Sequence, residues 1–246
     1  MSMRYAILGD IHANLAALDA VLAALDADSI DRILQVGDVV GYGAAPREVI
    51  AALRERDATV VKGNHDAACV GEVDARFFNP NARAAVEYTC AELTKEDLAW
   101  LADLPLTATL ADCAISHGTF SRPERYDYIQ CTEDADPSLD ALERPVCFLG
   151  HTHVPVSILR LVDSPNRTSY TIDRTLDLSE VTVALVNVGS VGQPRDEDSR
   201  AAYAIYDTDE QQVELFRVEY DIARESDRIL RAGLPRMLGD RLFLGL

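Results

Sequence analysis

Residues 4–12 read RYAILGDIH, an apolar run that ends on a glycine and leads directly into an aspartate and a histidine. The same pattern, a short apolar run closed by a small residue and polar side chains, occurs four more times. Those runs are RILQVGD (residues 32–38), TVVKGNHD (59–66), DCAISHG (112–118) and CFLGHTH (147–153). Short runs rich in Val, Ile, Leu or Ala are typical of buried strands. The sequence therefore predicts five strands that each end on polar side chains.

All histidines of the chain stand in these polar ends. They are His12, His65, His117, His151 and His153. Imidazole nitrogen and the oxygens of neighbouring Asp and Asn side chains are ligands for divalent metals, so the pattern indicates a polynuclear metal site built from distant segments. A spacing of two separates Asp10 from His12, and His151 from His153, which lets each pair point to one side of a strand end. The flanking glycines allow tight turns and a close approach to a metal or phosphate.

The first sixty residues alternate between strand and helix patterns. Strands are expected at Arg4–Gly9, Ile33–Gly37 and Ala58–Val61. Helices are expected over Asn14–Asp26, where apolar residues recur at helical spacing, and from Pro46 onward. This βαβαβ order predicts a parallel sheet with helices packed on it. Ligands of such sheets bind beyond the carboxyl ends of the strands, which is where the polar clusters fall.

The rest of the chain changes from helices to strands. Residues 66–104 have a helical pattern, clearest over Asn81–Leu93 and Thr94–Leu104, and Thr94 with Asp97 suggests a weak capping box. Further strands are expected at Leu106–Leu110, Cys113–Ser116, Val146–Leu149, Val154–Val162, Thr168–Ile172, Val181–Val188, Ala201–Tyr206 and Val213–Glu219. The first two of these flank a short turn and suggest a hairpin. Thr119–Asp140 is expected to be the least ordered stretch, a long loop that either covers a site or is poorly packed.

The sequence contains no repeat and no linker rich in Ser, Gly or Pro. One α/β domain over residues 1–246, with two packed sheets and outer helices, fits the pattern best. A helical tail closes the chain around Asp221–Leu242, so that the tail spans about 221–246. Its apolar residues predict a packed helix face rather than a membrane anchor, because the tail is not strongly basic. A dimer contact there stays open.

The charge of the chain limits its partners. The 246 residues include 23 Lys and Arg against 41 Asp and Glu, a formal net charge of −18. Nucleic-acid binders carry basic patches, and the few basic residues here are dispersed, so we do not expect nucleic acid to be the main partner. Exposed charges more than about 8–10 Å apart are largely screened, so a local cationic centre can still hold a small anionic substrate.

The cysteines and the N-terminus indicate the compartment. The five cysteines are odd in number and widely spaced, which predicts free thiols rather than a disulfide framework, and none stands beside a histidine cluster. The chain runs directly into a strand at Met3–Leu8, and no stretch approaches the roughly 18–20 apolar residues of a membrane span. We therefore expect a soluble cytoplasmic protein without a membrane partner.

Together the clusters resemble the calcineurin-like metallophosphoesterases. The family pattern of Asp-x-His, Gly-Asp, Gly-Asn-His-Asp/Glu, a lone His and Gly-His-x-His is complete and in order over residues 9–153. The later stretch NVGSVGQPR (residues 187–195) is similar to bacterial members of the family. The resemblance implies a four-layer α/β/β/α sandwich, in which two mixed sheets are flanked by helices.

The resemblance also implies a role for each site residue. Asp10, His12 and His153 would hold one divalent metal; Asn64, His117 and His151 would hold a second; Asp38 would bridge the two. His65 would face the phosphate or the leaving group, and Asp66 would position it. The nitrogen and oxygen donors suit Mn²⁺, Fe or Zn²⁺ and disfavour Ca²⁺. A pair of such ions can clamp a phosphoryl group and supply hydroxide for in-line attack on phosphorus.

The leading hypothesis is a hydrolase that acts on a small phosphodiester or phosphomonoester. Ser/Thr protein phosphatases and dinucleoside polyphosphate hydrolases are the alternatives, but their second motif typically contains an arginine that is missing from Gly-Asp-Val-Val-Gly-Tyr-Gly (residues 37–43). The pattern is closer to small bacterial phosphodiesterases. A non-catalytic interaction scaffold is a further alternative, disfavoured because His65 and all seven expected ligands are present.

Several residues have two interpretations. Arg122 and Arg125 either clamp a substrate phosphate or pair with neighbouring acids on the surface. Arg195 either forms a structural ion pair or contacts phosphate. Tyr42 either stacks on a substrate base or covers the metals. Asn14 is expected to be a helix N-cap.

Overall fold

The computed structural model describes residues 2–246 and contains two mixed six-stranded sheets. The first sheet has the strand order β3 (Thr59–Val60), β2 (Arg32–Gln35), β1 (Arg4–Leu8), β11 (Ala201–Asp207), β12 (Gln212–Val218) and β9 (Thr175–Asp177). The second has the order β4 (Thr107–Thr109), β5 (Ala114–Ser116), β6 (Val146–Leu149), β10 (Val181–Asn187), β7 (Val156–Leu161) and β8 (Ser164–Thr171). The first sheet therefore combines N-terminal and C-terminal segments of the chain, whereas the second is built from the central residues 107–187.

Each sheet contains a run of parallel strands, and the polar side chains follow the carboxyl ends of these strands. In the first sheet β1 pairs in parallel with β2, and β2 with β3, as the alternating strand and helix pattern predicts. In the second sheet β6 pairs in parallel with β5 and with β10. Antiparallel partners complete both sheets, for example β11 beside β1 and β7 beside β10. The carboxyl ends of the parallel strands thus lie along one edge.

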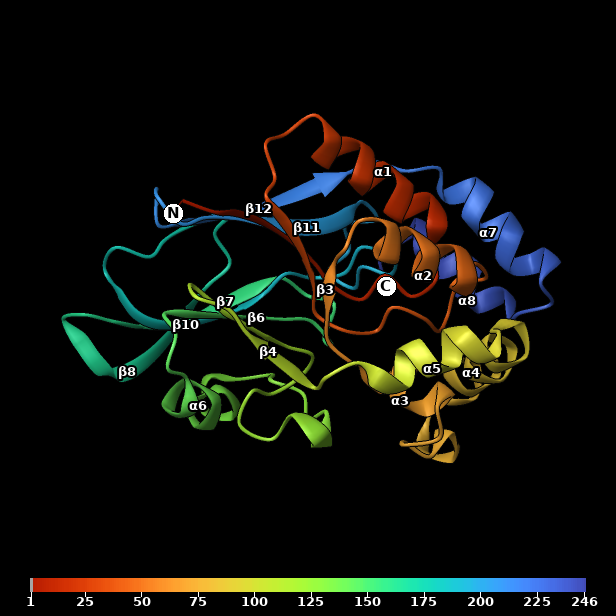
Figure 1. The fold of residues 1–246 in the computed structure, drawn as a ribbon, viewed down its shortest axis with the longest axis horizontal. Coiled ribbons are helices and arrows are strands. Elements are labelled where there is room, and N and C mark those ends of the chain that lie inside the picture. Colours follow the sequence, from red (N-terminus) through yellow and green to blue (C-terminus); the bar gives the residue numbers. More distant parts are fainter. Residues whose placement is uncertain (1) are drawn as a thin grey trace.

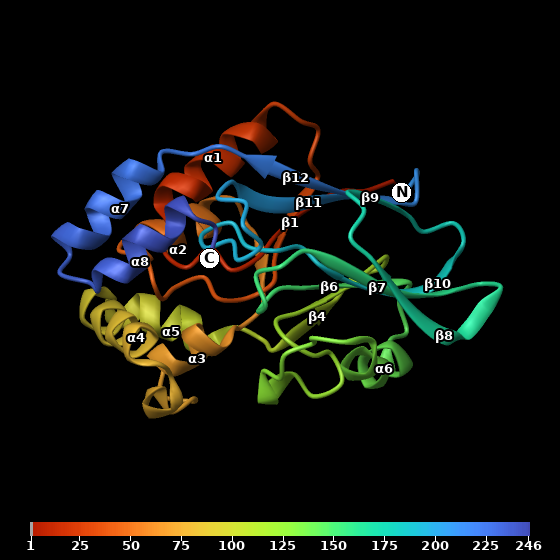
Figure 2. The same cartoon turned by 180° about the vertical axis from the view of Figure 1, so that it is seen from behind.

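Three buried clusters hold the layers together. The cluster between the sheets includes Ile7, Phe148 and Val186. Helices α1 (Leu15–Asp26), α2 (Pro46–Glu55) and α5 (Lys95–Asp103) contribute to a second cluster on the outer face of the first sheet. Helix α6 (Thr132–Ala141) covers the outer face of the second sheet through Ala135 and Leu139. Figures 1 and 2 show α1 and α6 on opposite sides of the molecule. The predicted α/β/β/α sandwich is confirmed.

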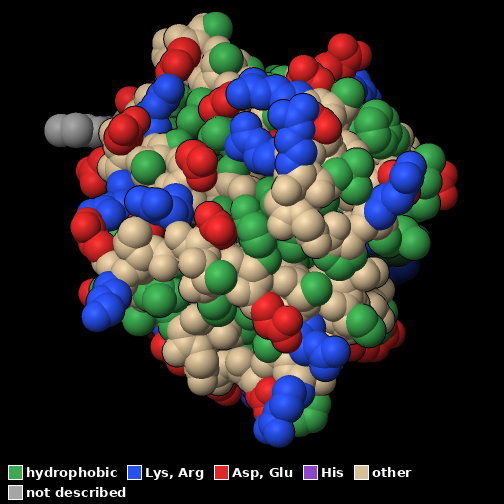
Figure 3. Space-filling view, turned by 90° about the vertical axis from the view of Figure 1, so that its right-hand side faces the viewer, with side chains coloured by type: hydrophobic (Ala, Val, Ile, Leu, Met, Phe, Trp, Pro, Cys, Tyr) green, Lys and Arg blue, Asp and Glu red, His purple; other side chains and the backbone are tan. Residues whose placement is uncertain are grey.

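The chain ends on helices that pack beside the sheets. Helices α7 (Ile222–Arg231) and α8 (Arg236–Asp240) and the 3-10 turn Arg241–Phe243 share a buried cluster with α4 (Pro80–Glu92). The tail is therefore two short helices, because Gly233 adopts a positive φ of 74° between them. Figure 3 shows this helical end, where acidic and basic side chains are interspersed and no histidine is visible. Within residues 2–246, no helix combines the length and apolar character needed to cross a membrane.

The expectation for residues 119–140 was partly wrong. The segment contains a 3-10 turn at Pro123–Arg125 and then α6, an ordered helix. The Asp134 carboxylate accepts hydrogen bonds from the backbone N–H groups of Gln130 and Cys131, which starts the helix. Pro137 inside α6 hides the helical pattern, and burial of the helix face against the second sheet outweighs its cost.

Other differences concern strand limits. The short edge strand β9 lacks a clear period in the sequence and was not predicted. Strand β8 begins earlier than expected, at Ser164, because Pro165 is tolerated at the edge of a sheet. Two caps are confirmed: the Asn14 side chain accepts from the Ala17 N–H, and Thr94 and Asp97 form a capping box for α5. All five cysteines are free thiols, as predicted.

Phe148 provides a test of the inter-sheet core, since its side chain is completely buried there. We predict that Phe148→Ala lowers the free energy of unfolding by about 3–5 kcal/mol, because it removes apolar contacts and leaves a cavity. Phe77→Ala, at a side chain that is 87% exposed, should change stability by less than about 0.5 kcal/mol. Equilibrium urea unfolding measures both. Equal losses would contradict the assignment of Phe148 to the core.

Candidate metal centre

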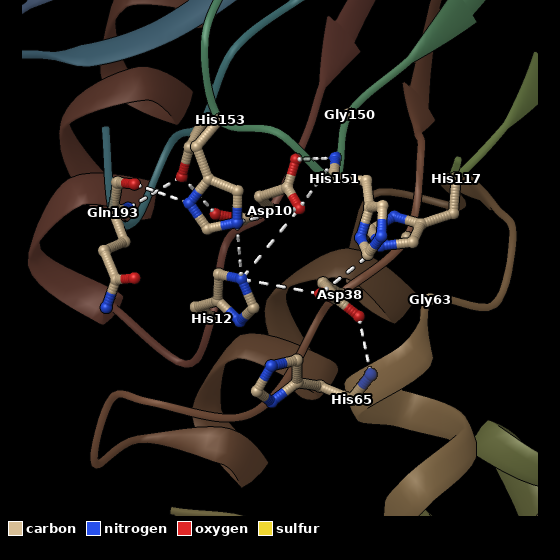
Figure 4. Close-up of polar contacts among 12 residues, drawn as sticks. Asp10, His12, Asp38, Gly63, His65, His117, Gly150, His151, His153 and Gln193 are labelled. Carbon is tan, nitrogen blue, oxygen red and sulfur yellow. Dashed lines mark hydrogen bonds and ion pairs between the residues drawn. The ribbon is translucent and has the colours of Figure 1, made fainter. Parts of the chain in front are cut away.

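Polar side chains from five strand ends meet at one edge of the packed sheets. They are Asp10 and His12 after β1, Asp38 after β2, Asn64 and His65 at the start of α3 (Asn64–Cys69), His117 after β5, and His151 and His153 after β6. Asn64 is partly buried and the others are buried. Figure 4 shows the rings of His12 and His153 on one side and those of His117 and His151 on the other. The structure thus brings together every residue that the sequence singled out as a ligand.

The backbone at this edge is held in an unusual conformation. Five of the seven expected ligands have positive φ angles: 48° at Asp10, 50° at His12, 56° at Asp38, 70° at His151 and 63° at His153. Residues with a Cβ rarely occupy this left-handed region, and such strain concentrates at functional sites. The sheets therefore impose a costly backbone geometry where the polar side chains converge.

The first group of donors consists of Asp10, His12 and His153. His12 Nδ1 lies 3.0 Å from the Val40 carbonyl oxygen, and His153 Nδ1 lies 2.6 Å from that of Gln193. Each Nδ1–H can therefore donate to a carbonyl, which leaves Nε2 as the free lone pair. The two Nε2 atoms are 3.1 Å apart, and Asp10 Oδ1 is 3.3 Å from that of His153.

The second group consists of Asp38, Asn64, His117 and His151. His117 Nδ1 lies 2.9 Å from the Val36 carbonyl oxygen, so its Nε2 also faces the site. This Nε2 is 3.0 Å from Asn64 Oδ1 and 3.4 Å from Asp38 Oδ2. His151 Nε2 is buried and has no hydrogen-bond partner among residues 2–246. Asp38, His117 and His151 can together hold a metal ion.

Asp38 lies between the two groups. Its Oδ2 is 3.5 Å from His12 Nε2 and 3.4 Å from His117 Nε2. Its Oδ1 accepts a hydrogen bond of 2.8 Å from the backbone N–H of His65. One carboxylate oxygen therefore faces both sets of imidazoles while the other is fixed by the backbone.

Burial decides the charge of most of these imidazoles. It lowers the pKa of His12, His151 and His153, and it lowers the pKa of His65 to about 4. These rings are therefore neutral at neutral pH, the state in which imidazole binds a metal. Burial also lowers the pKa of His117, but the adjacent Asp38 carboxylate outweighs it and raises that pKa to about 9. The His117 ring thus holds a proton at neutral pH, and a metal ion bound at its Nε2 would displace that proton.

These contacts fit a divalent cation. Two lone pairs that face each other at 3.1 Å, as on His12 and His153, repel unless a cation lies against both. The buried Nε2 of His151 likewise lacks a partner that the described residues could provide. Asp10, His12 and His153 form one cluster able to bind a metal ion, and the cluster of Asp38, His117 and His151 lies beside it. The donor set of nitrogen and oxygen suits first-row metals.

His65 and Asp66 occupy different surroundings although they are neighbours. The His65 ring packs against Tyr42 and Phe78, and its buried Nδ1 has no partner among the described residues. The Asp66 carboxylate instead accepts from the backbone N–H groups of Val39, Val40 and Gly63. Asp66 therefore fixes the loops around Asp38 and His65 and does not hydrogen-bond to the His65 ring.

Two glycines leave space for the imidazoles. Gly37 has a φ of 100°, and a Cβ there would lie 2.6 Å from His117 Nδ1. Gly41 has a φ of 90°, and a Cβ there would clash with His65 Nδ1. Larger residues would thus displace the rings. This packing role adds to the tight turns expected from the sequence.

The structure shows the contacts of the residues for which the sequence left two interpretations, namely Arg122, Arg125, Arg195 and Tyr42. Arg122 and Arg125 are more than half exposed, and both lie within ion-pair distance of Asp127. Among the described residues no carboxylate is that close to Arg195, whose guanidinium lies over the Tyr42 ring at 5.6 Å. Tyr42 packs against His12 and His65 beside the donor groups.

Tyr128 is a site residue that sequence reasoning missed. Its ring stacks on that of His151 with centroids 3.9 Å apart and an interplanar angle of 14°. The residue lies in a loop without a motif, so only its aromatic character in the segment after His117 could have signalled it.

Comparisons with known proteins find relatives that match this chain over nearly its whole length. A curated relative, an uncharacterised protein of Methanocaldococcus jannaschii, is 35% identical over 98% of this chain and 97% of its own. The crystal structure of a metallophosphoesterase from Sphaerobacter thermophilus is 40% identical, covers both chains completely and superposes with a TM-score of 0.86. A hypothetical protein of Pyrococcus horikoshii, 22% identical over 99% of both chains, shares the fold with a TM-score of 0.81.

The family assignment follows from the sequence match as well as from the fold. Residues 3–211 match the calcineurin-like phosphoesterase superfamily domain, and this range includes every donor of the candidate metal centre. The chain therefore belongs to the calcineurin-like phosphoesterase superfamily.

Proposed function

We propose that the protein is a hydrolase that uses two divalent metal ions to cleave a small phosphodiester or phosphomonoester. Family membership supports a hydrolase of phosphate esters. The observation that carries the proposal is the position of Asp38, whose Oδ2 lies within 3.5 Å of an imidazole in each donor group. This arrangement supports a shared carboxylate between two adjacent ions rather than two separate sites.

The donor groups divide the ligands between the ions. Asp10, His12 and His153 would hold one ion, Asn64, His117 and His151 the other, and Asp38 both. When bound, the pair supplies Lewis acidity and activates a water molecule for attack on phosphorus. Two carboxylates leave the pair with positive charge, so the centre attracts a phosphate anion in a chain whose net charge is −18. Mn²⁺, Fe and Zn²⁺ all match these ligands.

The surroundings of His65 support a role for it at the leaving group. It lines a pocket of about 390 Å³ together with Asn64, Phe78 and Tyr126, beside the second donor group. The His65 ring is held by Tyr42 and Phe78, and its backbone N–H is fixed by Asp38. Burial lowers the pKa of His65 to about 4, and a phosphate anion beside the ring raises it again. His65 would then donate a hydrogen bond or a proton to the departing oxygen.

Assays with chromogenic esters test the proposed reaction. We expect the purified protein to hydrolyse bis-p-nitrophenyl phosphate or p-nitrophenyl phosphate when Mn²⁺, Ni²⁺ or Zn²⁺ is added, and to lose this activity with a chelator. The ratio of the two rates distinguishes diesterase from monoesterase activity. An absence of turnover with every metal would favour a non-catalytic scaffold.

His65→Ala tests the role at the leaving group. We predict that it lowers kcat by roughly 10²–10⁴-fold, because a positioned proton donor contributes about that much. The metal content, measured by elemental analysis, should stay at the wild-type value, since His65 is not among the proposed ligands. A variant that lost metal but kept its turnover per metal ion would remove His65 from this role.

Asp38→Asn tests the shared carboxylate. The substitution keeps the oxygen that accepts from the His65 N–H but removes the charge between the donor groups. We predict that metal content falls at both sites. Bound metal should stabilise the wild type by about 2.7 kcal/mol at a hundred times its Kd, and this gain should disappear in the variant. Asp209→Asn, in an exposed turn, is the matched control. Retention of two ions by Asp38→Asn would argue against a shared ligand.

A further inference from the structure

A groove of about 880 Å³ runs beside the candidate metal centre. Thr152, which stands between His151 and His153, lines one end of it, and Tyr128, which stacks on His151, lines it as well. The volume lies in the range of about 300–1,000 Å³ that is typical of sites for small molecules. The groove therefore lies beside the proposed metal ligands, through the residue between two of them and a ring stacked on one of them.

Most of the groove surface is apolar. Ile129, Pro155 and Ile158 contribute to its walls. Tyr170 and Ile172, at the end of β8 and just beyond it, add side chains that are 68% and 77% exposed. Large apolar side chains gathered at one exposed place mark a binding surface more often than a chance arrangement. Within the described part of the chain no acidic side chain lines this groove, although the chain as a whole is strongly acidic.

Among residues 2–246, Arg195 is the one formally charged residue that lines the groove. Its backbone N–H donates to the His153 carbonyl, so the residue is tied to the first donor group. Its Nη2 donates to Gln193 Oε1 at 2.7 Å, and its buried Nε has no partner among residues 2–246. A guanidinium that lacks a carboxylate partner can interact with an anion. The charged part of a bound molecule is therefore expected near Arg195 and the metals, and its apolar part farther along the groove.

A second pocket leaves the metal centre in another direction. It is the pocket of about 390 Å³ that contains Asn64 and His65, and Tyr128 also lines it. The two hollows share Tyr128 and no other residue of their walls. A phosphorus atom held at the metals would thus have one hollow on the side of His65 and another on the side of Arg195. A molecule with two organic arms on one phosphate matches this arrangement.

We propose that the groove binds the non-leaving arm of a phosphodiester substrate, and that this arm is an uncharged apolar or aromatic group. This inference rests on the proposed phosphoesterase function. In the hydrolysis, the oxygen of water bonds to phosphorus and the bond to the leaving oxygen on the side of His65 breaks. The leaving oxygen takes a proton and departs as an alcohol. The arm in the groove stays esterified, so the second product is a phosphomonoester.

The test compares two diesters that release the same p-nitrophenolate, namely methyl p-nitrophenyl phosphate and bis-p-nitrophenyl phosphate. They differ in the non-leaving arm. The double variant Tyr170→Ser and Ile172→Ser removes two exposed apolar side chains from the groove and leaves the buried core intact. Val162→Ser is the matched control, because Val162 is 58% exposed at the turn between β7 and β8 and does not line the groove.

The measured quantity is the ratio of kcat/KM for the aryl and the methyl ester. Intrinsic reactivity of the esters cancels when this ratio is compared between variants. We expect the double variant to lower the ratio by about tenfold, from the apolar contact that is lost, while kcat/KM for the methyl ester changes by less than about twofold. The Val162→Ser control should keep the wild-type ratio. An unchanged ratio in the double variant, with both esters hydrolysed, would overturn the groove assignment and leave the proposed function intact.

Binding gives a readout that does not depend on turnover. Calorimetry on the metal-loaded protein should show that diphenyl phosphate binds at least about tenfold more tightly than dimethyl phosphate, with a negative heat-capacity change from apolar burial. The double variant should lose this preference. Tight diphenyl phosphate binding without hydrolysis of any ester would support the groove and refute the catalytic proposal. Equal affinity for the two phosphates would refute the groove.

Discussion

The carboxylate of Asp38 stands between two sets of buried imidazoles, and the rest of the site is arranged around it. One of its oxygens faces His12 and His117, and the other is held by the backbone N–H of His65. A buried carboxylate is stable only when positive charge or hydrogen bonds compensate for its loss of water. His117, whose pKa Asp38 raises to about 9, provides part of that compensation, and the proposed cation between the two groups would provide the rest.

The need to surround the buried Asp38 carboxylate explains why so many strand ends meet at one edge of the sheets. The donors come from five strand ends in two sheets, and five of the seven donor residues have left-handed backbone angles that residues with a Cβ rarely adopt. Strain of this kind persists only where the surroundings over-determine the conformation. The inter-sheet core around Phe148 and the backbone contacts of Asp66 supply that rigidity. The geometry of the candidate metal centre therefore depends on the packing of the inter-sheet core.

The two sides of the candidate metal centre have different surroundings, although similar donors lie on both. On one side the aromatic rings of Tyr42 and Phe78 enclose His65, and on the other an apolar groove with Arg195 leads toward β8. The proposed metal chemistry depends on the donor side chains, whereas pockets built from loops and edge strands would decide which ester fits. Under the proposed function, substrate preference would depend on segments with weak sequence patterns, such as the loop of Tyr128 and the end of β8.

The sequence by itself determined the two-sheet α/β class and the positions of Asp10, His12, Asp38 and the other donors, because a short apolar run closed by a polar cluster is a local pattern. It determined the Asn14 cap for the same reason. It did not determine α6, where Pro137 masks a helix that packing stabilises, nor the edge strand β9. Only the tertiary structure decided that Tyr128 stacks on His151 and that Arg195 lacks an acidic partner at the groove. Those contacts join residues that are distant in the chain, and their geometry depends on how the two sheets pack.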